Sequence, residues 1–219
     1  RQMAKAYAET FPFRDWMIRS GNRLKLAVFG DSPSKNIIVG RDGWLFFNME
    51  MALEDWLAVI PYSKADLDAA VGVMTARRDW LAKRGSAMLV VIAPNKSSVY
   101  GEFLPASLHK IGNETRLDQL ARAMEAARIP FLDLRSALAA AKNMHRAYWK
   151  TDTHWNGWGA FAGAAAIVDA LRQRFPAMPP LLAGGYRVEE RTIPGGDLAE
   201  MLLLEAEITE RAIDMVPLS

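Results

Sequence analysis

The chain has 219 residues, of which 51% are hydrophobic and 24% charged, so it is long enough to bury the core of a sizeable domain. Its 27 basic and 25 acidic residues are mixed along the sequence and leave a net charge of +2, which argues against a nucleic-acid-binding surface. There is no cysteine, which excludes disulfide and thiol chemistry, and the longest apolar runs are too short to span a membrane.

The first third of the chain predicts helices and one hairpin. Residues 1 to 29 carry apolar side chains at helical spacing, interrupted by Pro12 and Gly21, which predicts two short helices. Between 36 and 47 two apolar segments flank Asp42-Gly43, a dipeptide that favours the tight turn of a β-hairpin. Ser63 then stands at an N-cap position, and residues 65 to 83 predict a helix that Gly85 ends.

The rest of the chain alternates between strands and helices. The apolar run 87 to 93 predicts a buried strand. After it the sequence predicts a helix at 113–128, a strand at 129–134, and helices at 134–142 and 156–175. A further strand is expected at 184–193, and a helix is expected to start in GGDLAEMLLL, capped by Asp197. This order predicts an α/β fold with a mainly parallel central sheet flanked by helices.

Two loops are candidates for a functional site, because ligands of open α/β sheets bind beyond the carboxyl ends of the strands. In the loop YWKTDTHWN (148–156), an extended backbone would point Asp152 and His154 to the same side. A carboxylate can orient an imidazole and stabilise its protonated form, which suits proton transfer. Asp-x-His is nevertheless a short pattern, and such a histidine can instead cap the next helix or bind a carbonyl.

Five further side chains are candidate substrate-binding residues. Asn95 and Lys96 follow the predicted strand and could hold substrate or a developing negative charge, or could simply form a solvated turn. Tyr100, Trp149 and Trp155 could line the same groove, or could pack in the core. His109 and His145 have no second ligand at metal-site spacing, so no metal is expected.

Five segments occur in the same order as in a known family: FPFRDWMI, IIVGRDGWLFF, VVIAPNKSSVY, TDTHWNGWGA and GGDLAEML. With these segments, and over nearly its whole length, the chain resembles the SGNH-hydrolase-like O-acetyltransferases of the alginate AlgJ and AlgX type. The resemblance implies an SGNH-hydrolase-like fold and a polysaccharide O-acetyltransferase that works through a Ser-His-Asp triad and an acyl-enzyme. It also implies that Asp152 and His154 are the Asp and His of that triad.

The serine of the triad is not identified by these motifs. In the resembling family the nucleophile follows in a Gly-x-Ser type of turn, and the sequence reaches Ser219 before such a turn. We therefore expect residues 1 to 219 to be a single domain truncated before that turn. Ser32 in VFGDSPS is an alternative, because GDSL-type esterases present their nucleophile in Gly-Asp-Ser, but Pro33 removes a backbone N–H where those enzymes need a donor.

Two other functions stay open, a carbohydrate acetylesterase and a non-catalytic domain for glycan binding or assembly. The expected partners are a polysaccharide acceptor and an acetyl donor supplied by a membrane partner, with no cofactor. The expected location is the periplasm or the cell surface, with an anchor in a segment preceding residue 1.

Overall fold

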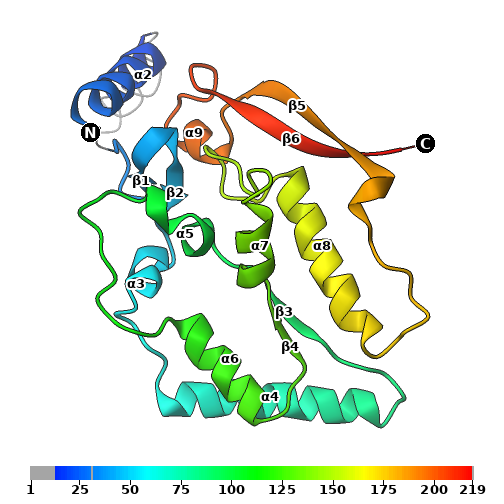
Figure 1. Cartoon of the computed structure of the whole chain (residues 1–219). Helices are drawn as coiled ribbons and strands as arrows, with labels where there is room; N and C mark the ends of the chain where they lie inside the picture. Colours follow the sequence, from blue (N-terminus) through cyan, green and yellow to red (C-terminus); the bar gives the residue numbers. More distant parts are fainter. Residues whose placement is uncertain (1–12, 31, 219) are drawn as a thin grey trace.

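The computed structural model describes residues 13–30 and 32–218 (Figure 1). Helix α2 (Arg14–Leu24) passes through Gly21 and continues into the π-helical turn η1 (Lys25–Phe29), which ends at Gly30 with a φ of 61°. The predicted break at Gly21 is therefore wrong, since a glycine costs a helix only about 1 kcal/mol and does not end it. Pro12 lies outside the described residues.

The predicted hairpin is confirmed. Strands β1 (Ile37–Val39) and β2 (Leu45–Phe47) pair antiparallel, with Ile37 opposite Phe47. The connecting turn η2 (Arg41–Gly43) has positive φ angles at Asp42 and Gly43, as the dipeptide predicted. The short helix α3 (Ala52–Trp56) follows the hairpin.

The βαβ unit is also confirmed. Strands β3 (Val90–Ile92) and β4 (Phe131–Asp133) pair in parallel, and α5 (Lys96–Val99), η3 (Gly101–Phe103) and α6 (Arg116–Ala126) connect them. The long helix α4 (Lys64–Ala82) precedes β3 and packs against α6. Both helices start with a capping box, in which a hydroxyl and a carboxylate three residues later accept from free backbone N–H groups. The pairs are Ser63 with Asp66 in α4 and Thr115 with Asp118 in α6.

The C-terminal part packs two helices and a long β-ribbon together. Helix α7 (Arg135–Ala141) lies against α8 (Gly157–Arg172), and α8 lies against β6 (Thr209–Pro217). Strand β6 pairs antiparallel with β5 (Tyr186–Pro194) over nine residues. In chain order the turn η4 (Ala183–Gly185) precedes β5, and helix α9 (Asp197–Met201) comes after β5 and before β6. The sequence did not predict β6. In the described residues the strands form three two-stranded sheets, of which β3–β4 is the parallel one.

Two apolar clusters hold these elements together. The larger joins the hairpin, α5, α7 and α8 through buried aromatic and aliphatic side chains, including Phe46, Tyr100, Leu138 and Trp158. The smaller packs Ile37 and Leu45 of the hairpin against Leu198 of α9 and against Leu202, the residue that follows this helix. Because α9 comes about 150 residues after the hairpin, this second cluster brings distant segments side by side in the upper part of Figure 1.

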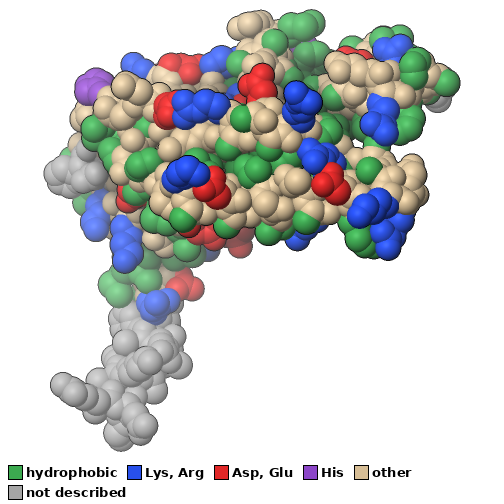
Figure 2. All heavy atoms as spheres, turned by 90° about the horizontal axis from the view of Figure 1, so that it is seen from below, with side chains coloured by type: hydrophobic (Ala, Val, Ile, Leu, Met, Phe, Trp, Pro, Cys, Tyr) green, Lys and Arg blue, Asp and Glu red, His purple; other side chains and the backbone are tan. Residues whose placement is uncertain are grey.

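The surface carries mixed charge on the face that Figure 2 shows, where Lys and Arg side chains alternate with Asp and Glu. This arrangement agrees with the mixed charge of the sequence. Among the described helices none combines the length and the apolar character that crossing a bilayer requires.

Candidate active site

The Asp152–His154 segment is a closed loop between α7 and α8. Tyr148 and Trp155 form an isolated antiparallel bridge, and the backbone N–H of Trp149 donates to the carbonyl of His154 at 3.2 Å. Asn156 then caps α8 by accepting from the N–H of Gly159 at 3.0 Å. The segment is bent, so the expectation of an extended backbone is wrong, although the two side chains do meet.

Asp152 and His154 form a hydrogen-bonded pair. The Nδ1 atom of His154 lies 2.7 Å from Oδ1 of Asp152, and the backbone N–H of His154 donates to the same oxygen at 2.9 Å. The N–H of Asp197 donates to Oδ2 of Asp152 at 3.1 Å. Partial burial raises the pKa of Asp152, but these N–H donors and the imidazole outweigh it and hold the pKa below its usual value. Asp152 is therefore ionised at neutral pH.

The imidazole faces outward with a defined tautomer. A carboxylate only accepts hydrogen bonds, so the proton of neutral His154 lies on Nδ1 and leaves Nε2 as a free acceptor. The His154 side chain is 72% exposed, whereas that of Asp152 is 23% exposed. The pair thus has the geometry of a general base, His154, whose ring is oriented by the less exposed carboxylate of Asp152.

A second carboxylate, which the sequence analysis assigned only to a helix cap, supports this pair. Gly196 is the N-cap of α9, and the carboxylate of Asp197 instead accepts from the N–H of Thr153 at 2.7 Å and from its hydroxyl at 2.5 Å. The Thr153 hydroxyl also lies 3.0 Å from Nδ1 of His154. Oxygen and nitrogen atoms of Asp152, His154 and Asp197 lie within 4.8 Å of one another, a spacing that could also hold a metal ion.

A buried cation holds the loop from the side of α5. Lys96 is 5% exposed, and its ammonium donates to the carbonyls of Trp149, Lys150 and Asp152 at 3.1, 3.0 and 2.7 Å. Burial lowers its pKa to about 7, although nearby carboxylates, Glu210 first among them, raise it. The alternative of a solvated lysine is therefore wrong, because the ammonium is buried against the backbone of the Asp-x-His loop.

A buried anion holds the loop from the side of β6. Glu210 is 6% exposed, and its carboxylate accepts from the N–H of Lys150 at 2.7 Å and from the N–H of Thr151 at 3.0 Å. It also accepts from the Thr151 hydroxyl and pairs with Arg146 at 3.1 Å. Sequence reasoning missed this residue, because the strand that carries it was not predicted.

The other predicted substrate-binding residues divide into open and packed positions. Asn95 is exposed and lines a hollow of about 60 Å³ together with Ser97 and Thr153. Tyr100 is buried, stacks on Trp44 at 4.4 Å, and accepts from the N–H of Ala147 at 2.8 Å. Both other candidates, Trp149 and Trp155, are half-buried, and Trp155 packs against the larger core cluster. Their roles in substrate binding stay predictions.

Ser32 forms a local turn. Its hydroxyl donates to the carbonyl of Ser34 at 2.6 Å and accepts from the Ser34 N–H at 3.2 Å. Within 13–30 and 32–218, no serine hydroxyl forms a hydrogen bond with the His154 ring. The turn geometry fits the non-catalytic role that Pro33 favours. His109 is exposed, and His145 packs edge-on against Trp158 with ring centroids 5.0 Å apart.

Comparison with known proteins identifies a family whose model covers most of the chain. The family model described as "SGNH hydrolase-like domain, acetyltransferase AlgX" matches residues 37–217. The probable alginate O-acetylases AlgJ of Pseudomonas syringae and Pseudomonas aeruginosa are both 29% identical, over 78% and 91% of this chain and 42% and 49% of their own lengths. The chain therefore spans less than half the length of these two relatives.

Solved structures show the same fold. The O-acetyltransferase domain of Pseudomonas putida AlgJ matches with a TM-score of 0.53 and 24% identity, over 83% of this chain and 66% of that one. PatB1 of Bacillus cereus matches with a TM-score of 0.57 and 17% identity, over 83% of this chain and 58% of that one. On the match of the family model to most of its length, the chain belongs to the AlgX acetyltransferase family of SGNH-hydrolase-like domains.

Proposed function

We propose that Asp152 and His154 are the proton-transferring pair of a polysaccharide O-acetyltransferase. The observation that carries the proposal is the 2.7 Å contact between Nδ1 of His154 and Oδ1 of Asp152, with Nε2 turned to an exposed surface. Family membership and the names of the relatives, probable alginate O-acetylases, support the reaction class. Serine nucleophiles need a base of this kind because the free hydroxyl attacks poorly.

The reaction proceeds in two steps that share His154. A serine hydroxyl gives its proton to Nε2 as its oxygen attacks the acetyl carbonyl of the donor, and the imidazolium then protonates the departing donor group. The acetyl group now forms an ester with the serine. A sugar hydroxyl next gives its proton to Nε2 and attacks this ester, and the serine leaves with the returned proton.

Asp152 stabilises the imidazolium in both steps. Its low pKa keeps it negative, and its three N–H contacts keep it in place. Water in place of the sugar would complete a hydrolysis with the same groups, so access of the acceptor decides between transferase and esterase.

The position of the site agrees with an α/β fold. Asn95 and Lys96 follow β3 after Ala93 and Pro94, so the site lies at the carboxyl end of the parallel pair. We infer that β3–β4 belongs to a mainly parallel central sheet of the whole protein. A periplasmic or cell-surface location, with the acetyl donor supplied by a membrane partner, completes the proposal.

The test compares single variants of the whole protein with an activated acetyl ester and a soluble glycan. His154→Ala and Asp152→Asn are each expected to lower transfer by about 10³–10⁴-fold, because each removes a member of one catalytic unit. Acetylated glycan is measured by mass spectrometry and free acetate separately. His109→Ala, which changes another exposed histidine, is the matched control. Undiminished turnover in His154→Ala would overturn the catalytic assignment.

A further inference from the structure

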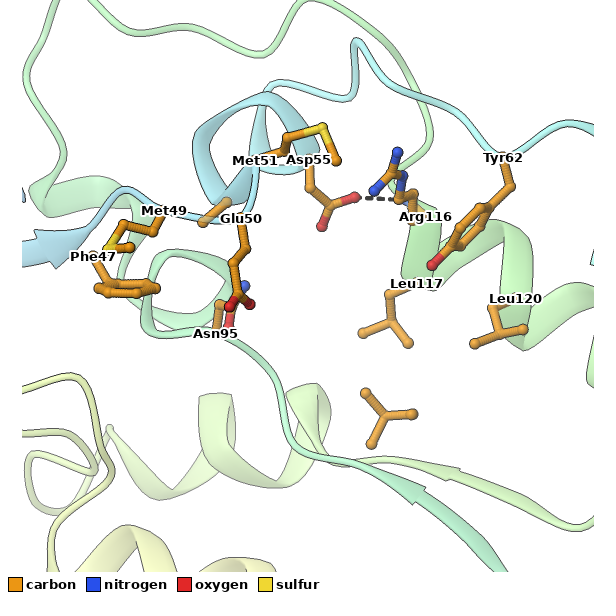
Figure 3. A pocket seen from close by; sticks show the side chains of 12 residues that line it. Phe47, Met49, Glu50, Met51, Asp55, Tyr62, Asn95, Arg116, Leu117 and Leu120 are labelled. Atoms are coloured by element: carbon orange, nitrogen blue, oxygen red, sulfur yellow. Dashed lines mark hydrogen bonds between the residues drawn. The ribbon is translucent and has the colours of Figure 1, made fainter. Parts of the chain in front are cut away.

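A hollow of about 300 Å³ lies between the hairpin, α3 and α6 (Figure 3). Phe47, Glu50 and Asn95 lie on one side of it, and Tyr62, Leu117 and Leu120 lie on the other. Its volume is at the lower end of the range of about 300–1,000 Å³ for small-molecule sites, which suits a single ring-sized group.

This hollow, which we call the α3–α6 hollow, continues toward the catalytic pair. Phe47, Ala52 and Asn95 line both the α3–α6 hollow and the smaller one beside it. The smaller hollow is also lined by Thr153, whose hydroxyl contacts Nδ1 of His154. A chain-like ligand in the α3–α6 hollow could therefore extend toward Thr153, the neighbour of the catalytic pair.

Three polar groups of the α3–α6 hollow are free to bind a ligand. In the described part of the chain the Glu50 carboxylate, the Asn95 amide and the Tyr62 hydroxyl have no hydrogen-bond or ion-pair partner, and all three residues are exposed. The surfaces between them are apolar, with Phe47, Leu117 and Leu120. Spaced hydrogen-bonding groups around apolar patches match the two kinds of surface on a sugar ring, hydroxyls at the rim and C–H groups on the faces.

The backbone that presents Glu50 is strained. Glu50 and Met51 have φ angles of 55° and 61°, in the left-handed region that side chains other than glycine rarely adopt. Both residues line the α3–α6 hollow. Such strain persists where the surrounding structure imposes it, and it concentrates at ligand sites.

The charge of the α3–α6 hollow selects against anions. It contains two carboxylates, Glu50 and Asp55, and one cation, Arg116. The Nε atom of Arg116 donates to the carbonyl of Ile60 at 2.8 Å and the guanidinium lies 4.9 Å from the Tyr62 ring centroid, so the carboxylates of the hollow outnumber its one cation. An acidic sugar would therefore meet an unpaired carboxylate at Glu50, whereas a neutral sugar would offer it hydroxyl donors.

We propose that the α3–α6 hollow is an acceptor subsite for an uncharged pyranose residue of the glycan, next to the residue that receives the acetyl group. The carboxylate of Glu50 and the amide of Asn95 bind ring hydroxyls on one side, and the Tyr62 hydroxyl binds on the other. That the bound sugar belongs to the glycan that accepts the acetyl group rests on the proposed function. The binding of the sugar itself requires no reaction.

The test measures binding to the whole protein without any acetyl donor. A neutral β-linked glucotetraose and a tetra-uronate of equal length are titrated while amide and side-chain NMR shifts are recorded. We expect the neutral tetraose to bind at least tenfold more tightly and to shift signals of Glu50, Tyr62 and Asn95. Equal or tighter binding of the uronate, binding of neither, or shifts confined to another surface would each overturn the proposal.

Variants separate the subsite from the catalytic pair. Asn95→Ala and Tyr62→Phe should each weaken the neutral tetraose about fivefold, and Glu50→Gln should abolish the discrimination against the uronate. Glu125→Gln, an exposed glutamate of α6 outside the hollow, is the matched control and should change neither affinity. Unchanged discrimination in Glu50→Gln would contradict the role of charge. Tetraose binding that persists in His154→Ala, with turnover unaffected by that change, would overturn the proposed function and leave the subsite standing.

Discussion

Lys96 shows how a single buried side chain can hold the backbone of a loop that carries a candidate active site. All three N–H groups of an ammonium are directed to carbonyls of the Asp-x-His loop. The same atom lies 5.6 and 5.3 Å from the ring centroids of Trp44 and Phe46, so the hairpin covers it. The loop is held by its backbone, which leaves the side chains of Asp152 and His154 free for chemistry.

Below pH 7, where Lys96 is protonated, replacing it with methionine should destabilise the protein by about 3 kcal/mol or more, because a buried carboxylate and three carbonyls lose their cation. Burial lowers the pKa of Lys96 from 10.5 to about 7. Between these values the unfolded chain binds the proton and the folded chain does not, so Lys96 makes the unfolding free energy rise with pH over this range. Urea denaturation at pH 7 to 10 should show this rise in the wild type and its absence in Lys96→Met.

Lys83→Met is the matched control for this change, since Lys83 is exposed at the end of α4. It should alter neither the stability nor its pH dependence by a measurable amount. A Lys96→Met protein as stable as Lys83→Met would show that the three carbonyl contacts do not hold the loop.

At the residue scale the sequence predicted the Asp152–His154 pair but not the groups that hold it. Spacing of two residues made the pair a candidate, and the resemblance to the O-acetyltransferase family implied that it is the Asp and His of a triad. Asp197 and Glu210 lie 45 and 58 residues after Asp152 and gain their roles only from packing, as does the inward direction of Lys96. No local pattern records contacts of that separation, because local sequence reports backbone preference and burial periodicity.

At the element scale, the start of α9 is fitted tightly to the loop. The N–H of Gly196 donates to the Thr151 hydroxyl at 2.9 Å, and the N–H of Leu198 donates to the Thr151 carbonyl at 3.0 Å. A Cβ atom added at Gly196 would meet the side chain of Asp152, with Oδ2 at 2.7 Å. Glycine is thus required at this position for close approach, since its φ of −83° is open to any residue.

Gly196→Ala should therefore push Asp152 away from His154. We expect a loss of stability of about 1–3 kcal/mol and a fall in turnover of about 10²-fold, since a displacement of about 1 Å in a catalytic group has that effect. Thermal unfolding and acetyl-ester kinetics measure the two results. Gly72→Ala, in the middle of α4 with open space around it, should raise stability by about 0.5–1 kcal/mol and leave kinetics unchanged. If both alanine variants behaved alike, close packing at α9 would not be what places Asp152.

Elements with a strong local signal were predicted well, and those defined by long-range pairing were not. Helix α4 has its capping box and its terminating Gly85 in the sequence, so it was predicted within a residue or two. Strand β6 carries charged residues at several positions and is stabilised by its nine pairs with β5, so no apolar alternation revealed it. The predicted strands were also longer than β3 and β4, because their apolar runs extend beyond the residues that pair.

At the scale of the whole molecule, the site is assembled from four distant parts of the chain. The hairpin supplies Leu45, whose N–H donates to the Lys150 carbonyl at 2.9 Å, α5 supplies Lys96, α9 supplies Asp197, and β6 supplies Glu210. Each contacts the same short loop, so the catalytic geometry depends on the entire fold. Mutations far from Asp152 in sequence should therefore reach it through these contacts.

Glu210→Ala tests this dependence on the fold. The change leaves the N–H groups of Lys150 and Thr151 and the cation of Arg146 without their carboxylate partner. We expect a fall in kcat of about 10²-fold with little change in KM, because the loop that carries His154 shifts while the α3–α6 hollow, built from other elements, is retained. Hydrogen exchange of the Thr151 amide, now unpaired, should accelerate together with that of Leu198, which donates to the Thr151 carbonyl.

Glu207→Ala changes an exposed glutamate three residues earlier and is the control for composition and charge in this part of the chain. It should leave kcat, KM and the exchange rates as they are. Equal effects of the two changes would mean that the β-ribbon acts on the site through overall stability or charge. A selective loss in Glu210→Ala would instead mean that β6, the strand no local pattern predicted, fixes the backbone on which the proton-transferring pair stands.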